Sequence, residues 1–387
     1  MRYFFDIVTW ELRKLGEVSD IVRGSSPRPI SDSKWFDTNS KVGWLRISDV
    51  TSQQGRIKKL DQHLSKLGEE KTRVLLSPHL LLSIAASVGY PVINYVPTGV
   101  HDGFLIFKNP KFQLNYGFYW LQNNKNKWQK YGQPGSQVNL NSSIVENAKI
   151  FLPNNNEQSK IIALLLRIDK MLALQQRKLK ELQQVKQTLS QFLLNGNTHT
   201  PPTLRFNGFE DIWKENKLKD IAKISMGQSP SSNNYNKKGN GKILIQGNAD
   251  IDNGGIRPRV WTTEITKLAN KNDILLTVRA PVGELAITNR EVVIGRGIAA
   301  IKGNKFIYNL LVQKNKEHFW DRISSGSTFK SISSNDIKQL KVYIPSEKEE
   351  TLIASILVTI KNKIDFQNER INVINKLKKY LLTNLFI

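Results

Sequence analysis

Hydrophobic residues recur at 3.5-residue spacing through residues 158–194, the pattern of a long helix with one apolar seam. The same ladder returns near the C-terminus, with every seam position displaced by 192. Even the polar interruptions coincide, because Gln175 matches Gln367 and Lys186 matches Lys378. Polar seam residues fix register and partner choice, so the two helices are predicted to pair in one alignment. Two unrelated amphipathic helices on separate cores would not share these interruptions. The predicted seam comprises Ile161, Leu165, Ile168, Leu172, Gln175, Leu179, Leu182, Lys186, Leu189, Leu193, Ile353, Leu357, Ile360, Ile364, Gln367, Ile371, Ile374, Lys378, Leu381 and Leu385.

The rest of the chain is one unit written twice. A tryptophan followed by a Gly-x-Ser-Pro turn opens each copy, with Trp10 and Gly24 in the first and Trp213 and Gly227 in the second. Further on, LSIAASVG at 82–89 matches LTVRAPVG at 276–283. Each copy then has a Gly-Ser element, at 135–136 and at 326–327, and a strand that ends in proline before the long helix begins.

Local signals inside each copy are mostly those of short strands separated by Gly, Pro, Asn and Ser. Strands are predicted at 43–47, 80–84, 103–107, 242–245, 273–278 and 297–301, and helices at 116–129 and 309–322. The predicted divisions are a first domain at 1–153, a long helix at 154–195, a linker at 196–204, a second domain at 205–345 and a C-terminal helix at 346–387.

The short linker constrains how the helices pair. A helix of this length runs roughly 55–60 Å, and parallel pairing would require the linker to lead the chain back over that distance, nearly straight. Antiparallel pairing needs no such return. The expected fold class is therefore α/β, with two strand-rich mixed α/β domains at opposite ends of an antiparallel two-helix coiled coil and a pseudo-two-fold internal repeat.

The net charge of the chain indicates what class of partner it binds. The chain has 57 basic and 33 acidic residues, a net charge of +24. The two helices account for +4 and +2, so +18 belongs to the globular parts. A surplus of this size favours a polyanionic partner, most often nucleic acid and less often an acidic membrane surface. A basic surface kept only for solubility does not need so large an imbalance.

Several classes of protein are disfavoured by what the sequence lacks. It has no cysteine, which excludes disulfides and thiolate metal sites and is typical of a reducing cytoplasm. Its five histidines are scattered without metal-ligand spacing, so no metal site is expected. No signal peptide opens the chain, and the longest apolar run, 80–88, is too short to cross a bilayer. A cytoplasmic protein is expected.

Several sequence motifs resemble those of a known protein family. WELRKLGEVSDIVRGSSPRP with WLRISDV after it, LRFNGFEDIW and the two long helices are similar to the specificity subunit of a type I restriction-modification enzyme over essentially the whole chain. The resemblance implies two target-recognition domains that each read one half of a split double-stranded DNA sequence. It also implies that the helices set the gap and hold methyltransferase subunits, two being expected, with restriction or translocase subunits in the full complex. One departure is the very short lead before Trp10, which bears on whether the N-terminus contributes to assembly.

Catalytic motifs are missing. A DNA adenine methyltransferase needs an (N/D)PP(Y/F) loop for the flipped base, and the nearest phrase, NPKF at 109–112, lacks the second proline. No GxxxxGK(S/T) phosphate loop occurs. We therefore expect a non-catalytic subunit without a cofactor, with S-adenosylmethionine, ATP and Mg on its partners. Two alternatives stay open: a single-chain DNA-modifying or DNA-cleaving enzyme with an unrecognised motif, and a coiled-coil interaction protein whose charge is incidental.

Candidate DNA-contacting residues come from the repeat. Positions framed alike in both copies but occupied differently are where two domains on one scaffold could read different bases. The three such pairs are Ser25 with Gln228, Ala85 with Arg279, and Asp102 with Arg296. Arg and Gln are the side chains that best bond two atoms of a guanine or adenine edge. Backbone phosphate contacts are predicted at Arg28, Lys34, Arg46, Lys127, Lys130, Tyr131, Arg257, Arg259 and Lys330.

Overall fold

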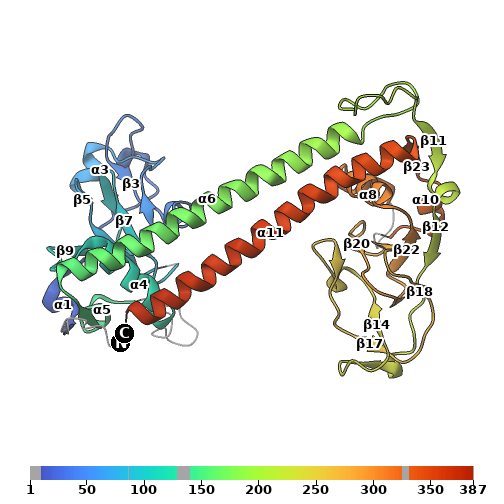
Figure 1. Ribbon diagram of the computed structural model, residues 1–387. Coiled ribbons are helices and arrows are strands. Elements are labelled where there is room, and N and C mark those ends of the chain that lie inside the picture. The colour runs from blue at the N-terminus through green and yellow to red at the C-terminus, as the bar shows by residue number, and fades with distance from the viewer. Residues whose placement is uncertain (1–9, 86, 129–139, 325–330, 387) are drawn as a thin grey trace, which may run out of the picture. The chain divides into compact units, whose positions relative to one another are not determined.

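The computed structural model describes residues 10–85, 87–128, 140–324 and 331–386. Two compact units are formed, one by Met1–Gln176 with Arg370–Ile387 and one by Arg177–Glu369. Each unit contains a strand-rich domain and segments of both long helices (Figure 1). The two Gly-Ser elements lie outside the described residues.

The first domain is built on a five-stranded sheet of order β2-β9-β6-β7-β4 and a three-stranded sheet of order β3-β8-β5. The pairs β4–β7 and β3–β8 are parallel and the other pairs are antiparallel. The strands are β2 Asp20–Arg23, β3 Gly43–Trp44, β4 Arg56–Ile57, β5 Arg73–Leu75, β6 Leu80–Ser83, β7 Pro91–Asn94, β8 Thr98–Val100 and β9 Phe104–Lys108. All residues of β6 and β7 are buried, which is why that stretch is a continuous apolar run instead of an alternating one.

Short helices pack on the sheets of this domain, and its first and last strands pair with each other. The helices are α1 Leu15–Val18, α2 Ile47–Ser52, α3 Lys66–Glu70, α4 Leu114–Trp128 and α5 Ser142–Glu146, with a 3₁₀ turn at Ser33–Trp35. α4 buries Tyr116, Tyr119 and Trp120 against the sheet and the long helices. β1 Glu11–Lys14 pairs antiparallel with β10 Lys149–Leu152, so the first and last strands of the domain are neighbours.

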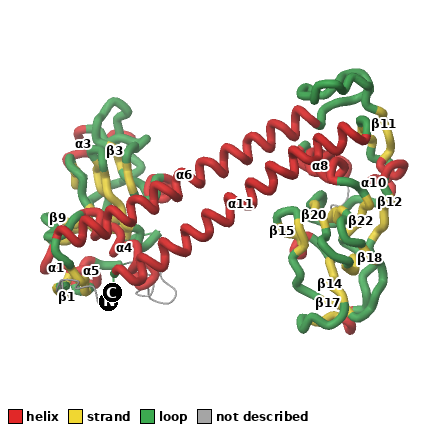
Figure 2. The backbone as a smooth tube through the Cα atoms, viewed as in Figure 1, coloured by secondary structure: helices red, strands yellow, loops and turns green. Residues whose placement is uncertain are grey.

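The second domain repeats the central sheet as β12-β22-β19-β20 and adds a five-stranded sheet of order β13-β17-β14-β21-β18 (Figure 2). The strands are β11 Lys214–Lys217, β12 Lys223–Met226, β13 Tyr235–Asn236, β14 Lys242–Ile245, β15 Ile251–Asp252, β16 Gly255–Ile256, β17 Trp261–Thr262, β18 Leu268–Ala269, β19 Ile274–Thr277, β20 Leu285–Ile287, β21 Val292–Ile294, β22 Ile298–Lys302 and β23 Lys341–Ile344. β11 pairs with β23 as β1 does with β10. The helices are α7 Leu218–Ile221, α8 Lys305–Lys316, α9 Phe319–Ile323 and α10 Ser334–Lys338, with 3₁₀ turns at Ser232–Asn234 and Asn248–Asp250.

The two long helices are α6 Asn155–Leu193 and α11 Glu347–Leu385, each of 39 residues. In the first unit Ile168 and Leu172 share a core with Ile374, while Ile161 shares one with Leu382. Partner numbers on α11 fall as those on α6 rise, so the helices are antiparallel there. In the second unit Lys186 is near enough to Lys361 for the two charges to repel. Leu193 shares a core with Ile353, farther back along α11, so the helices are again antiparallel. Every predicted seam position is buried or half-buried.

The predicted fold class is confirmed in each unit: a mixed α/β, strand-rich domain carried with an antiparallel helix pair, and repeated. Two local predictions were wrong. The strand predicted at 43–47 ends at Trp44, because Asp49 accepts a hydrogen bond from the backbone N–H of Arg46 and starts α2. The helix predicted at 309–322 begins at Lys305, capped by Asn304, and is split into α8 and α9 by His318, whose φ is 56°.

Candidate nucleic-acid interface

Three strand ends of the first domain meet at one edge of its central sheet. β9 is antiparallel to both β2 and β6, with Arg23 opposite Leu105 and Ser83 opposite Phe104. The ends of β2 and β6 therefore lie beside the start of β9. The segments that follow or precede those ends are 24–28, 84–85 and 101–103, and they contain all three predicted base-reading positions of this domain. We call these segments the turn edge of the first domain.

The second domain builds the same edge. Met226 of β12 lies opposite Ala299, and Thr277 of β19 opposite Ile298, both on β22. Its turn edge consists of residues 227–231, 278–279 and 295–297, and contains Gln228, Arg279 and Arg296. In each domain the structure thus brings the three predicted positions together.

The Gly-x-Ser-Pro motif is what holds the turn against the sheet. The backbone N–H of Gly24 donates to Phe104 O at 2.9 Å, and a Cβ at Gly24 would lie 2.1 Å from His101 O, so only glycine fits. The hydroxyl of Ser26 then accepts a hydrogen bond from the N–H of Asp102 at 3.2 Å. These contacts pin the turn to the start of β9.

The equivalent contacts recur in the second domain. Gly227 N–H donates to Ile298 O at 2.8 Å, and a Cβ there would lie 2.1 Å from Gly295 O. Ser229 Oγ accepts from the N–H of Arg296 at 3.1 Å. The two turn edges therefore share a backbone frame and differ in the side chains mounted on it.

Asp102 is occupied by partners within its own domain. Its carboxylate accepts hydrogen bonds from Ser26 Oγ at 2.9 Å and from Arg28 Nη2 at 2.8 Å. Burial would raise the pKa of Asp102, but the Ser26 hydrogen bond and the charge of Arg28 outweigh it and leave that pKa below its usual value. The carboxylate is therefore charged at neutral pH, and its two oxygens face a serine and an arginine.

His101 contributes an aromatic face and no charge. Its ring lies between Trp44, with centroids 5.7 Å apart, and Phe104, with centroids 4.9 Å apart. Burial lowers the pKa of His101, and the nearby Asp102 offsets that only in part. The positive charge of this turn edge accordingly comes from arginine.

Gln228, Arg279 and Arg296 all have exposed side chains. No carboxylate among the described residues pairs with the guanidinium of Arg296. The backbone of Gln228 is fixed, because its carbonyl accepts a hydrogen bond from Thr266 Oγ1. Gln246, which the sequence did not single out, also lies at this edge, against Gly295, and its amide donates a hydrogen bond to Tyr235 Oη at 3.0 Å. The signal that could have found it is its place directly after β14.

The predicted phosphate-contacting residues are dispersed. Three exposed or half-exposed side chains besides Arg28 hold an acidic neighbour: Lys34 with Asp32 at 2.8 Å, Arg46 with Asp49 at 3.2 Å, and Arg259 with Asp250 at 3.1 Å. Lys127 and Arg257 are exposed. Lys130, Tyr131 and Lys330 lie outside the described residues.

The long helices carry a second apolar stripe outside their seam. On α6 it includes Leu164, Met171, Leu174 and Val185. On α11 it includes Val373, Leu377 and Tyr380, whose side chains are 64%, 48% and 64% exposed. Together these side chains place exposed apolar surface along both long helices.

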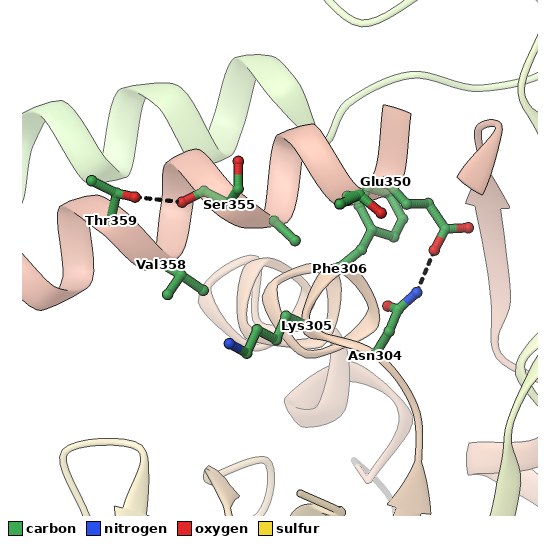
Figure 3. Close-up of a pocket in the computed structure, with 9 residues that line it drawn as sticks. Asn304, Lys305, Phe306, Glu350, Ser355, Val358 and Thr359 are labelled. Carbon is green, nitrogen blue, oxygen red and sulfur yellow. Dashed lines mark hydrogen bonds between the residues drawn. The ribbon is translucent and has the colours of Figure 1, made fainter. Parts of the chain in front are cut away.

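A hollow of about 470 Å³ lies where α8 begins against α11. Figure 3 shows Phe306, Val358 and Thr359 around it, and at one end Asn304 donates a hydrogen bond to Glu350. Burial raises the pKa of Glu350, which the Asn304 hydrogen bond partly offsets. The lining along α11 is therefore mixed, with Thr351, Ser355 and Thr359 beside Ala354 and Val358, and Glu350 lies at its charged end.

Known proteins resemble this chain over nearly its whole length. The family model described as the type I restriction modification DNA specificity domain matches residues 7–184 and again 210–376. The chain belongs to this family. A Methanocaldococcus jannaschii protein with the provisional name type I restriction enzyme MjaX specificity subunit is 26% identical over 405 residues, covering 97% of this chain and 92% of that protein.

Solved structures share the fold. A type I restriction-modification S subunit from M. genitalium aligns with a TM-score of 0.63 at 14% identity, over 100% of this chain and 98% of that one. A chain from a structure of a type I restriction-modification system, whose title concerns complex assembly and conformational transition, aligns with a TM-score of 0.60 at 23% identity over 97% of both chains.

Family membership decides the role. The protein is a specificity subunit that recognises DNA sequence in a type I restriction-modification system, and recognition rather than catalysis is its part in that system. DNA and the other subunits of such a system are its implied partners. Among the described residues no cluster of His, Asp or Glu could hold a metal ion, and no helix is long and apolar enough to cross a membrane.

Proposed function

We propose that each domain reads one half of a bipartite double-stranded DNA sequence with its turn edge, and that the long helices set the gap between the half-sites and hold the methyltransferase subunits. The observation that carries this proposal is the repeated turn edge. Its backbone hydrogen bonds are the same in both domains. The N–H groups of Gly24 and Gly227 donate to the central sheet, and the hydroxyls of Ser26 and Ser229 accept from the backbone of the facing segment. Only the mounted side chains differ, which is what two readers of different sequences require.

The chemistry of these side chains suits DNA. Arg and Gln form paired hydrogen bonds with guanine and adenine edges in the major groove, and the second turn edge carries Gln228, Arg279 and Arg296. The surplus of +18 on the globular parts supplies attraction to phosphates. Exposed cations such as Lys127 and Arg257 are suited to that sequence-independent role.

The helices suit assembly. Each is continuous for 39 residues, roughly 58 Å, and presents an apolar stripe that its own seam does not use. The stripe and the hollow beside α8 are the surfaces we assign to two methyltransferase partners. S-adenosylmethionine, ATP and Mg would then belong to the partners, and the complex would act in the cytoplasm, where its DNA is.

Exchange of one domain tests the proposal. Residues 205–345 are replaced by the matching region of a relative with a different target, the variant is expressed with its methyltransferase partner, and methylated sites are mapped across the genome. One half of the recognised sequence should change while the other half and the activity persist. A change in both halves at once would contradict independent reading. The reciprocal exchange of residues 10–153 is the matched control and should alter only the opposite half.

A further inference from the structure

Each turn edge has an arginine at one of two facing positions, but the position that carries it differs between the two domains. In the first domain Arg28 is supplied by the turn, one residue after the Pro27 of Gly-x-Ser-Pro, while the facing position at the start of β9 is Asp102. In the second domain the turn has Ser231 at that place and the facing position is Arg296. Each edge therefore has one arginine at this facing pair of positions.

Arg28 is held in a defined direction. Its Nη2 lies 2.8 Å from Asp102 Oδ2, yet 75% of its side chain is exposed. Asp102 is itself held by Ser26, and the carbonyl of Asp102 also accepts a hydrogen bond from Arg23. An exposed arginine gains little stability from a surface ion pair, so this arrangement orients a guanidinium more than it stabilises the fold.

We propose that Arg28 and Arg296 are equivalent base-reading residues, each bonding a guanine in the half-site of its own domain, and that Asp102 is the positioning residue for Arg28. The inference rests on the proposed function and revises the sequence-based assignment of Arg28 to phosphate and of Asp102 to a base. The planar guanidinium offers two parallel donors to the O6 and N7 atoms of guanine. A carboxylate whose oxygens are already occupied is a poor acceptor for cytosine.

The two arginines differ in whether a neighbouring carboxylate orients the guanidinium. Arg28 has a carboxylate partner, whereas none among the described residues pairs with Arg296. A side chain that is already oriented loses less conformational freedom on binding. The guanine contacted by Arg28 should accordingly be discriminated more strictly than that contacted by Arg296.

Arg→Lys variants separate base reading from phosphate binding, because lysine keeps the charge and loses the paired donors. Arg28→Lys and Arg296→Lys are made in the complex with its methyltransferase partner, and methylation is mapped on a library of sites with every base substituted in turn. Each variant should lose about 5- to 150-fold discrimination at one guanine, in opposite half-sites, with the other positions unchanged. Arg13→Lys is the matched control. Arg13 lies on β1, which pairs with β10 outside the turn edge, and its guanidinium forms ion pairs with Glu11 and Glu17.

The same measurement tests Asp102 as a positioning residue. Asp102→Asn should relax the same base pair as Arg28→Lys, and adding Asp102→Asn to Arg28→Ala should cause no further loss, since the two act as one unit. A purely structural Asp102 would instead lower thermal stability and add its effect to that of Arg28→Ala. Asp102→Glu should restore part of the discrimination.

The outcomes distinguish this inference from the proposed function. If Arg28→Lys and Arg296→Lys keep the wild-type target at every position, while the alanine variants weaken binding to all sequences equally, these arginines contact phosphate and the inference is overturned. If the wild-type complex shows no bipartite target, the proposed function itself fails. Relaxation at two bases of the same half-site would also overturn the assignment, because the two arginines belong to different domains.

Discussion

The carboxylate of Asp169 lies 2.6 Å from Nζ of Lys378 and so joins α6 to α11 in the first unit. Tyr119 Oη donates a hydrogen bond to the same carboxylate at 2.7 Å. Burial, and then the carboxylate itself, raise the pKa of Tyr119, which keeps the phenol protonated as a donor. At equivalent repeat positions the second unit has Lys361 and Lys186. Burial, followed by Lys316 and Lys361, lowers the pKa of Lys186. The α6 and α11 segments therefore have the same seam pattern in both units but different charged residues at equivalent positions.

Asp169→Asn should destabilise the first unit by about 1–3 kcal/mol, because it weakens a hydrogen bond and an ion pair that are mostly removed from water. Glu181→Gln on the same helix is the control. Its partner Arg177 is 78% exposed, and such pairs contribute less than about 0.5 kcal/mol. Denaturant unfolding measures both, and equal losses would show that the Asp169 network carries no special weight.

Arg205→Ala should cost about 3–5 kcal/mol in the second unit, because it leaves a buried charge without its partner. The Glu349 side chain is 2% exposed, and its oxygens accept hydrogen bonds from Arg205 Nε and Nη2, both at 2.9 Å. The double variant Arg205→Met with Glu349→Leu should recover most of the loss in thermal unfolding. Failure to recover would mean that Arg205 acts through its contact with Asp211 O instead.

Binding of the assembled complex to DNA should weaken steeply with salt. If six to ten phosphates are contacted, affinity falls by about 10³ to 10⁵ between 50 and 200 mM salt. Titration of a labelled duplex at four salt concentrations gives the slope. A flat response would contradict the assignment of the +18 surplus to a DNA-facing surface.

Deletion of residues 177–183 removes one heptad, about 10 Å of helix, and keeps the seam in phase. The contacts on the two sides of the deletion, Asp169 with Lys378 and Leu193 with Ile353, can then no longer both keep their present alignment. We expect a gap between half-sites altered by about three base pairs, or a complex that fails to retain its methyltransferase. Methylome sequencing decides, and an unchanged gap with normal activity would show that the helices do not set the distance.

Leu377→Asp should weaken methyltransferase binding without unfolding the chain, because that side chain is 48% exposed on the α11 stripe. Asn372→Asp is the control, since residue 372 is exposed and points to another face of the helix. Co-purification measures retained partner. Equal retention in both variants would remove the stripe as a docking surface.

The helices could be predicted because seam periodicity is a one-dimensional signal, and all twenty seam positions are indeed buried or half-buried. Asp169 was missed because it lies off the seam and its partners, Lys378 and Tyr119, come from distant segments. The break at His318 has no Gly or Pro to announce it, since a histidine adopts the left-handed conformation there.

The turn-edge positions were found by comparing the two copies, which share a frame. The sequence does not predict the direction in which a side chain on these turns points. Arg28 and Asp102 are 74 residues apart, and their pairing depends on how the turn meets β9. Sequence alone therefore assigned Arg28 to phosphate by its charge.

The pairing of first with last strands fixes an order of events during synthesis. Glu11 pairs with Leu152 and Lys214 with Ile344, so on the ribosome β1 and β11 must wait for almost a whole domain to emerge. Ile168 and Leu172 wait longer, because Ile374 belongs to the last helix made. Until α11 leaves the exit tunnel, Ile168 and Leu172 present an uncovered apolar surface that a nascent-chain chaperone could bind. A messenger truncated before residue 370 would leave that surface permanently exposed, so incomplete chains should be insoluble or degraded.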